Sequence, residues 1–237
     1  MLKNYSVINI LGIRLHKISR PDLEKEIVSA LSAKGRPVLF IATINPSFIM
    51  RAQKDEAFKD ILNKKTTINV ADGVGLKLAD KNLEIITGVK ITSILLSYAE
   101  KLGKSVLVVT KKDSLTPKTA IQHYFHINYP KLYFSVREEA SLDVREHDVL
   151  LCALGEAAQE KFIVDNTSFI KPKVAVGIGG TFDVLIGTVR VPRTKYFGWV
   201  FRLLANPKRL PKIIKSVLIF PILVIARRNE VTAKQSR

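Results

Sequence analysis

A chain of 237 residues with 47% hydrophobic residues is long enough for one sizeable α/β domain or two small ones. Its 38 basic and 21 acidic side chains give a formal net charge of +17, which predicts an anionic partner: nucleic acid, anionic lipid or a phosphorylated substrate. The single cysteine, Cys152, excludes an internal disulfide and a cysteine-rich metal site, and no signal peptide is recognisable, so we expect a cytoplasmic protein.

Short runs of β-forming apolar residues alternate with stretches of helical length. The runs cover residues 38–44, 67–71, 106–110, 149–153 and 174–178. This alternation predicts an α/β fold with a Rossmann-like, mainly parallel sheet and helices on both faces. One helix is well marked, because Asn45 is a typical N-cap, Pro46 suits the first helical position, and apolar residues recur at helical spacing as far as Leu62.

Ligands of open parallel sheets bind beyond the carboxyl ends of the strands. The predicted architecture therefore brings together Thr43, Asn45, Asp72 and the glycine-rich residues 177–180. Asp72 follows a strand and precedes Gly73, which favours a tight turn close to a ligand. A carboxylate there suits a general base, whereas the structural alternative is an N-cap of the following helical turn; the two roles are compatible.

Residues 174–187, VAVGIGGTFDVLIG, suit a phosphate cradle of backbone N–H groups, with a plain strand-to-loop turn as the alternative. They are not a dinucleotide fingerprint, because the third glycine of G-x-G-x-x-G would fall at Phe182. Gln159 and Glu160 follow another strand end, where either reaches the crevice or lies on a solvated helix face. The chain has no Asp-x-Asp pair and its histidines are scattered, so we expect no metal site.

The clearest change in composition comes near residue 190. From there on the chain has twelve Lys or Arg and one acidic residue, Glu230. We therefore predict a core over residues 1–190 and a basic C-terminal appendage over 191–237. Within the appendage, an amphipathic helix would place four basic residues near one face: Lys208, Arg209, Lys212 and Lys215.

An apolar run of ten residues, 217–226, follows this basic helix and contains Pro221. A bilayer crossing needs roughly 20 residues, so we expect the run to lie on an anionic membrane surface rather than to span it. The alternative is that it docks on its own domain or on a second subunit. Nucleic acid is not expected as a partner, because the basic residues do not interleave with aromatic ones.

Several linked stretches of the chain resemble the WecG/TagA/CpsF glycosyltransferase family. They lie in order over about residues 38–212 and read TINPSFI, VADGVG, TGVKITSIL, GEAAQE, GIGGTFDVLIGTVRVP and WVFRLLANPKRL. The resemblance implies an inverting, metal-independent enzyme of cell-surface polysaccharide synthesis, which uses no cofactor. Its implied reaction moves an N-acetylhexosamine, most typically N-acetylmannosamine, from a UDP-sugar donor to a sugar on undecaprenyl diphosphate. It also implies peripheral association with the cytoplasmic face of the plasma membrane through the basic appendage.

The resemblance also implies roles for individual residues. Asp72 stands where the family has its catalytic base, and three residues fall at the matching active-site strand ends: Thr43, Asn45 and Gly73. Four residues are expected to contact the nucleotide donor: Gln159, Gly177, Gly179 and Gly180. Arg202 and Arg209 are expected to compensate the diphosphate charge of the donor or the lipid acceptor.

The chain departs from the family pattern around this base. Ile85 replaces the arginine of R-x-T-G, Lys90 replaces an acidic residue, Ala157 replaces the proline of G-x-P-x-Q-E, and Gly198 replaces a glutamate. The glycines expected after the middle strand are replaced by TKKDS. We expect these changes to bear on the substrate more than on the fold. They leave one alternative open, a diverged protein that binds a nucleotide sugar or lipid carrier without efficient transfer. Separately, because an exposed apolar tail would aggregate, we expect either membrane binding or a homo-oligomer.

Overall fold

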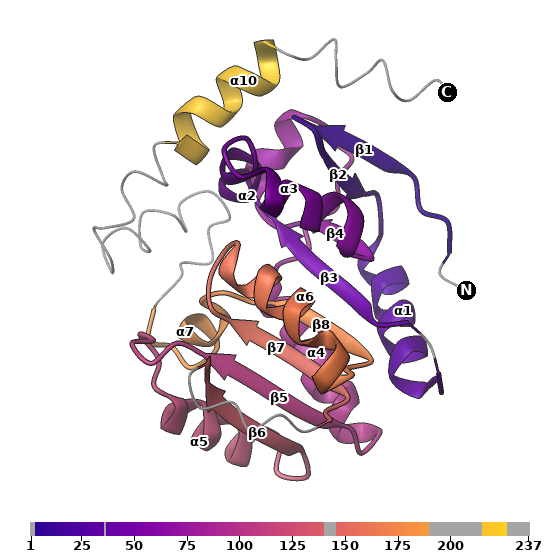
Figure 1. Ribbon diagram of the computed structural model, residues 1–237, viewed down its shortest axis with the longest axis vertical. Helices are drawn as coiled ribbons and strands as arrows, with labels where there is room; N and C mark the ends of the chain where they lie inside the picture. Colours follow the sequence, from indigo (N-terminus) through magenta and orange to yellow (C-terminus); the bar gives the residue numbers. More distant parts are fainter. Residues whose placement is uncertain (1–2, 36, 140–145, 190–214, 227–237) are drawn as a thin grey trace.

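The computed structural model describes residues 3–35, 37–139, 146–189 and 215–226. Six parallel strands form one sheet in the order β4-β3-β8-β7-β5-β6, with helices on both faces (Figure 1). The strands are β3 (Leu39–Ile44), β4 (Ile68–Ala71), β5 (Ser105–Thr110), β6 (Tyr133–Glu138), β7 (Val149–Ala153) and β8 (Val174–Gly177). The predicted Rossmann-like parallel sheet is confirmed.

The prediction from the sequence did not include three of the observed strands. An antiparallel hairpin of β1 (Val7–Ile10) and β2 (Ile13–His16) precedes the sheet, and β6 forms its outer edge. The central strands are almost wholly buried, so they are continuous apolar runs, whereas β6 has one fully buried residue, Val136, and an exposed Tyr133. An edge strand with polar positions lacks the apolar run that marks its central neighbours.

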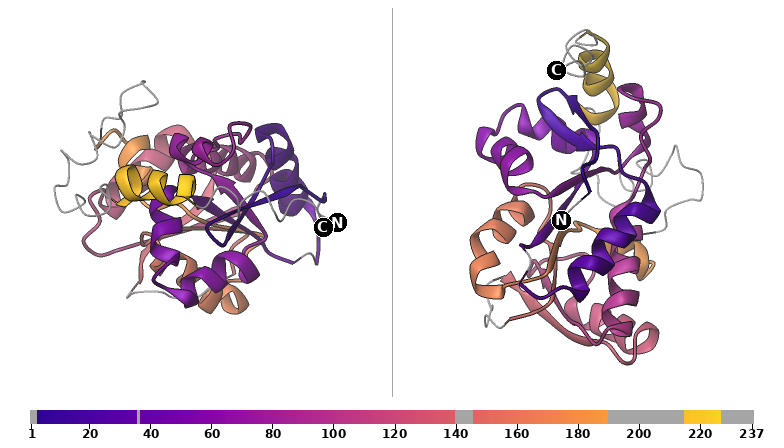
Figure 2. Two further views of the ribbon diagram at one scale, coloured as in Figure 1. Left: turned by 90° about the horizontal axis from the view of Figure 1, so that it is seen from above. Right: turned by 90° about the vertical axis from the view of Figure 1, so that its right-hand side faces the viewer.

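Alternate side chains of the strands pack against different helices. In β3, Ile41 belongs to a core shared with α1 (Arg20–Ser32), α4 (Gly88–Lys101), α5 (Lys118–Asn128) and α7 (Thr181–Leu185). Phe40, its neighbour, packs with α6 (Ala158–Ile170) on the opposite face, and the two helical layers are seen edge-on in Figure 2. Both faces are therefore covered, and ligands can approach at the ends of the strands.

The prediction of one continuous helix from Pro46 to Leu62 is wrong. It is divided into α2 (Pro46–Ala52), α3 (Glu56–Asp60) and a π-helical turn, η1 (Ile61–Lys65). The break has two visible causes. The Gln53 side chain donates to the carbonyl of Leu11 at 2.8 Å, and the Asp55 carboxylate accepts from the N–H of Phe58 at 3.1 Å, so that a new helix begins.

The apolar run near the C-terminus forms a π-helical turn, η5 (Lys215–Ile219), and α10 (Phe220–Ala226). Phe220 and Val224 are buried in the core that also holds α2 and the β1–β2 hairpin, and α10 lies over this end of the molecule (Figures 1 and 2). The run therefore docks on its own domain, as one of the two expectations had it. None of the described helices has the length and apolarity needed to cross a bilayer.

Candidate active site

Asp72 directly follows β4 at the carboxyl end of the sheet. Its backbone N–H donates to the carbonyl of Ile44, the last residue of the neighbouring β3, at 2.6 Å. Its side chain is half-buried, and Oδ2 accepts a hydrogen bond from the N–H of Gly88 at 3.3 Å. The residue is thus held by its backbone at the strand edge and by its carboxylate at the first residue of α4.

The structure does not support Asp72 as the cap of the turn that follows it. That turn, η2 (Val74–Leu78), has Gly73 at its N-cap position and no side-chain cap. Gly73 has a φ of +127°, which glycine adopts far more readily than other residues. The carboxylate of Asp72 instead joins β4 to α4, whose own cap is Thr87. The catalytic role of Asp72 stays a prediction.

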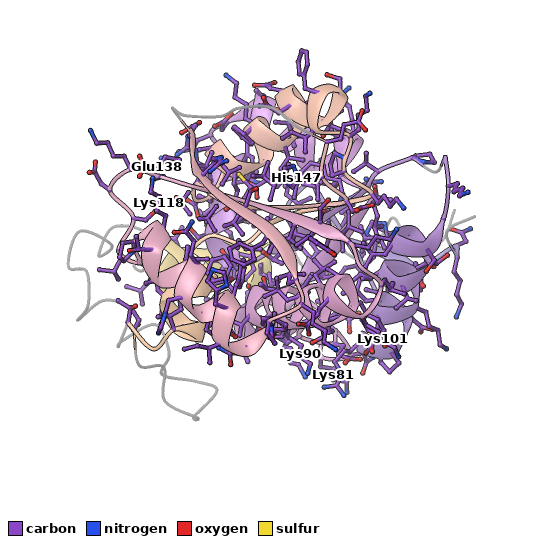
Figure 3. All side chains as sticks on the ribbon, turned by 90° about the horizontal axis from the view of Figure 1, so that it is seen from below. Lys81, Lys90, Lys101, Lys118, Glu138 and His147 are labelled. Atoms are coloured by element: carbon purple, nitrogen blue, oxygen red, sulfur yellow. The ribbon has the colours of Figure 1, made fainter. Side chains whose placement is uncertain are left out.

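Gly88 reaches Asp72 because residues 85–87 run beside β4. The N–H of Ile86 donates to the carbonyl of Ala71 at 2.8 Å, and Ala71 forms a parallel bridge with Ile85. Ile85, a departure from the family pattern, is therefore a partly buried apolar side chain close to Asp72. Lys90, another departure, is exposed on α4, on the side where Figure 3 also labels Lys81.

Thr43 and Asn45 lie beside Asp72, as predicted. Thr43 is buried in β3, and its Oγ1 donates to the carbonyl of Gly177 at 3.3 Å. Asn45 is the N-cap of α2, and its Oδ1 accepts from two backbone N–H groups of the first turn at 2.9 and 3.2 Å. A Cβ at Gly73 would lie 3.9 Å from that of Asn45, so the ends of β3 and β4 are closely packed.

The glycine loop, residues 177–180, leaves β8 between these strand ends and β7. The backbone of Gly179 adopts a left-handed conformation, with a φ of +50°. A Cβ at Gly88 would lie 3.1 Å from Oγ1 of Thr181, the residue after the loop. The loop is therefore packed against the start of α4, where the Asp72 carboxylate is bonded, and the predicted site residues from β3, β4 and β8 meet there.

Gln159 and Glu160 are buried, with 2% and 0% of their surface exposed, so the solvated-face alternative is wrong. Gln159 Oε1 accepts from the N–H of Gly179 at 2.9 Å, and its Nε2 donates to Glu160 Oε1 at 2.7 Å. Glu160 Oε2 accepts from the N–H of Ala157 at 2.8 Å. This Gln159–Glu160 relay joins the loop after β7 to the glycine loop.

The relay explains the glycine at the end of β8. A Cβ at Gly177 would lie 2.4 Å from Gln159 Nε2 and 2.5 Å from Glu160 Oε1, so any larger residue there would require these buried side chains to move. Burial raises the pKa of Glu160 to about 7, against the opposing effect of the hydrogen bonds from Gln159 and Ala157. A titrating carboxyl group therefore supports the glycine loop from within the protein.

Sequence reasoning did not assign five further polar residues at this edge. Ser47 Oγ donates to Glu156 Oε2 at 2.8 Å and ties the start of α2 to the loop after β7. Thr116 Oγ1 donates to Asp183 Oδ1 at 2.7 Å and ties the segment after β5 to α7. Lys111 directly follows β5. The strand-end rule that selected Asp72 also points to Lys111, but the contacts of Glu156 and Asp183 depend on tertiary structure.

Other predictions for the site concern metals and the C-terminal arginines. Within the described part of the chain, no three His, Cys, Asp or Glu side chains are grouped so that they could hold a metal ion. Arg202, Arg209 and Gly198 lie outside the described residues, and so does the predicted basic helix apart from Lys215, the first residue of η5. Their predicted contacts with a diphosphate stay predictions.

A model of the glycosyl transferase WecG/TagA/CpsF family matches residues 8–234. The chain belongs to this family. It is similar to two proteins named N-acetylglucosaminyldiphosphoundecaprenol N-acetyl-beta-D-mannosaminyltransferase, from Staphylococcus aureus strains MRSA252 and NCTC 8325 / PS 47. Each is 24% identical to this chain, and the match covers 92% of this chain and 91% of the relative. The family resemblance found in the sequence is confirmed, and the protein is a glycosyltransferase-family enzyme.

Proposed function

We propose that this glycosyltransferase moves N-acetylmannosamine from UDP to a sugar, N-acetylglucosamine, on undecaprenyl diphosphate. The name of its relatives supports both the sugar and the acceptor. The observation that carries the proposal is the half-buried Asp72 carboxylate, held by Gly88 at the carboxyl end of the sheet and next to the glycine loop. Such an edge is where ligands of open α/β sheets bind.

The proposed chemistry is one inverting displacement. Asp72 accepts the proton of the acceptor hydroxyl as that oxygen forms its bond to the anomeric carbon of the donor. The bond from the anomeric carbon to the UDP oxygen breaks on the opposite face, and UDP leaves with the electron pair. The hydrogen bond from Gly88 orients the carboxylate, and the glycine loop lies where donor phosphates can approach the backbone.

We propose that this displacement needs no protein-bound metal. The described residues offer no group of metal-binding side chains, which supports this part of the proposal. The developing charge on UDP would then be balanced by cationic side chains, with Arg202 and Arg209 as the predicted ones. Removing one cation that acts in the transition state typically costs about 2 to 4 kcal/mol of barrier.

We further propose that the enzyme works at the cytoplasmic face of the plasma membrane without spanning it. The outward side of η5 and α10 is apolar, with Leu218, Ile222 and Ile225 each more than half exposed. The chain around them is strongly basic by sequence. An exposed apolar side next to basic residues favours binding to anionic lipid, where the lipid-linked acceptor is found. Self-association through the same side is the alternative.

The decisive experiment is acceptor-dependent release of UDP. The full-length protein is mixed with UDP-N-acetylmannosamine and anionic liposomes that contain undecaprenyl diphosphate-N-acetylglucosamine, with and without EDTA. We expect release that survives EDTA, collapses in Asp72→Asn and persists in the matched control Asp165→Asn, which changes an exposed aspartate of α6. UDP binding without release would favour the non-catalytic alternative, and an active Asp72→Asn variant would remove Asp72 as the base.

A further inference from the structure

The ammonium group of Lys111 lies over the loop that leaves β7. Thr110, the last residue of β5, is paired with Ala153, the last residue of β7, and Lys111 follows directly. Its Nζ is 3.7 Å from the point that a Cβ on Gly155 would occupy. Gly155 has a φ of +87°, a conformation that favours glycine, and the absence of a side chain lets the ammonium group of Lys111 come close to its backbone. Lys111 therefore reaches from β5 towards β7, the strand beside the glycine loop.

The backbone of Lys111 is fixed by hydrogen bonds, whereas its ammonium group forms none with the described residues. Ser114 donates to the Lys111 carbonyl through its N–H at 3.3 Å and its Oγ at 2.9 Å. The described residues provide no hydrogen bond or ion pair for its Nζ. By contrast, Lys118 lies 3.9 Å from Glu138 at the outer strand, and Figure 3 shows the two side by side. Lys111 is thus an exposed cation at the carboxyl edge, unpaired within the described residues.

The carboxyl edge of the sheet already carries negative charge, so binding of a diphosphate there would require a cation to offset the repulsion. Asp72 and Glu156 lie directly after a strand or in the loop that follows it, and Asp183 lies in the first turn of α7, just after the glycine loop. A nucleoside diphosphate would bring further negative charge into the same crevice. Of the described residues that directly follow the six strands, Lys111 is the only cationic one. An ammonium group binds phosphate as a compact point charge without needing a fixed direction.

We infer that Lys111 binds the diphosphate of the nucleotide donor and offsets its charge. This inference rests on the proposed function, because it takes the crevice beside the glycine loop as the donor site. Lys111 would contact phosphate oxygens at the β5–β7 side, and the backbone of the glycine loop would approach them from β8. The sequence TKKDS, which begins at the last residue of β5, then supplies by charge what a glycine-rich turn would supply by backbone N–H groups.

The test compares binding of three probes to the full-length protein: UDP, uridine and inorganic pyrophosphate. We expect Lys111→Met to weaken binding of UDP and pyrophosphate by roughly 10- to 100-fold and to leave uridine within about twofold. Lys111→Arg should recover part of the loss. The matched control is Lys112→Met, which removes the neighbouring exposed lysine of the same turn and should change nothing.

The outcomes separate this inference from the proposed function. Equal UDP affinity in wild type and Lys111→Met overturns the inference, and so does an equal loss of uridine and UDP binding. If the wild type binds pyrophosphate through Lys111 but neither UDP nor uridine, the anion site stands and the proposed nucleotide donor is wrong. If the wild type binds neither pyrophosphate nor UDP, the inference is overturned. Folding is checked by the thermal midpoint, which an exposed lysine should not move.

Discussion

Replacing Glu160 with glutamine should remove a pH-dependent loss of stability from this protein. Glu160 has none of its surface exposed, and burial raises its pKa from the ordinary 4.5 to about 7. A carboxyl group with a raised pKa holds its proton more tightly in the folded state than in the unfolded state. The stabilisation from this more tightly held proton is fully present below about pH 4.5, and it is lost as the pH rises through about 7.

The size of the effect follows from the two pKa values. Between about pH 5 and pH 8, a group that titrates near 4.5 unfolded and near 7 folded lowers the free energy of unfolding by about 2 to 3 kcal/mol. Glu160→Gln keeps the side-chain shape and cannot ionise. The difference in unfolding free energy, variant minus wild type, should therefore increase by about 2 to 3 kcal/mol over this range.

The assay is urea unfolding of both proteins across the pH range, followed by circular dichroism. Burial lowers the pKa of His16, so its contribution to stability is lost as the pH falls, which is opposite in sign to the effect of Glu160. Subtracting the two proteins cancels His16 and every other shared group. A difference that stays flat within about 0.5 kcal/mol from pH 5 to pH 8 would refute the reasoning, since Glu160 would then titrate alike in both states.

Three further predictions concern the relay and α10. Glu160→Gln leaves either the Ala157 or the Gly179 amide without an acceptor, and hydrogen exchange of that amide should accelerate at least about tenfold. The double variant Gln159→Glu with Glu160→Gln again supplies an acceptor to each of the three donors of the relay and should restore protection from exchange. Failure of this rescue contradicts the assigned hydrogen bonds. Gly177→Ala should lower the unfolding free energy by about 1 to 3 kcal/mol in urea titrations, because its methyl group collides with the relay; an unchanged midpoint would mean that the relay yields easily. Phe220→Ala should cost about 3 to 5 kcal/mol and the exposed control Ile222→Ala less than about 0.5, and equal values would show that α10 does not dock as described.

The linear pattern of the chain was sufficient for the sheet and for part of the site. Fully buried parallel strands must be continuous apolar runs, so β3, β4, β5, β7 and β8 are visible in the sequence. The carboxyl ends of parallel strands meet at one edge, which is why the sequence alone places Thr43, Asn45 and Asp72 together. The N-cap at Asn45 is equally local, because its acceptor serves N–H groups of the next turn.

Only the tertiary structure decided the surroundings of those residues. Whether Gln159 and Glu160 face solvent or the core depends on how α6 packs, and the relay to Gly179 crosses twenty positions of sequence. Gly88 meets Asp72 because residues 85–87 run beside β4, and Lys111 lies over Gly155 because β5 and β7 are neighbours in the sheet. Local propensity and periodicity carry no information on such contacts, since they arise from strand order and packing between elements distant in sequence.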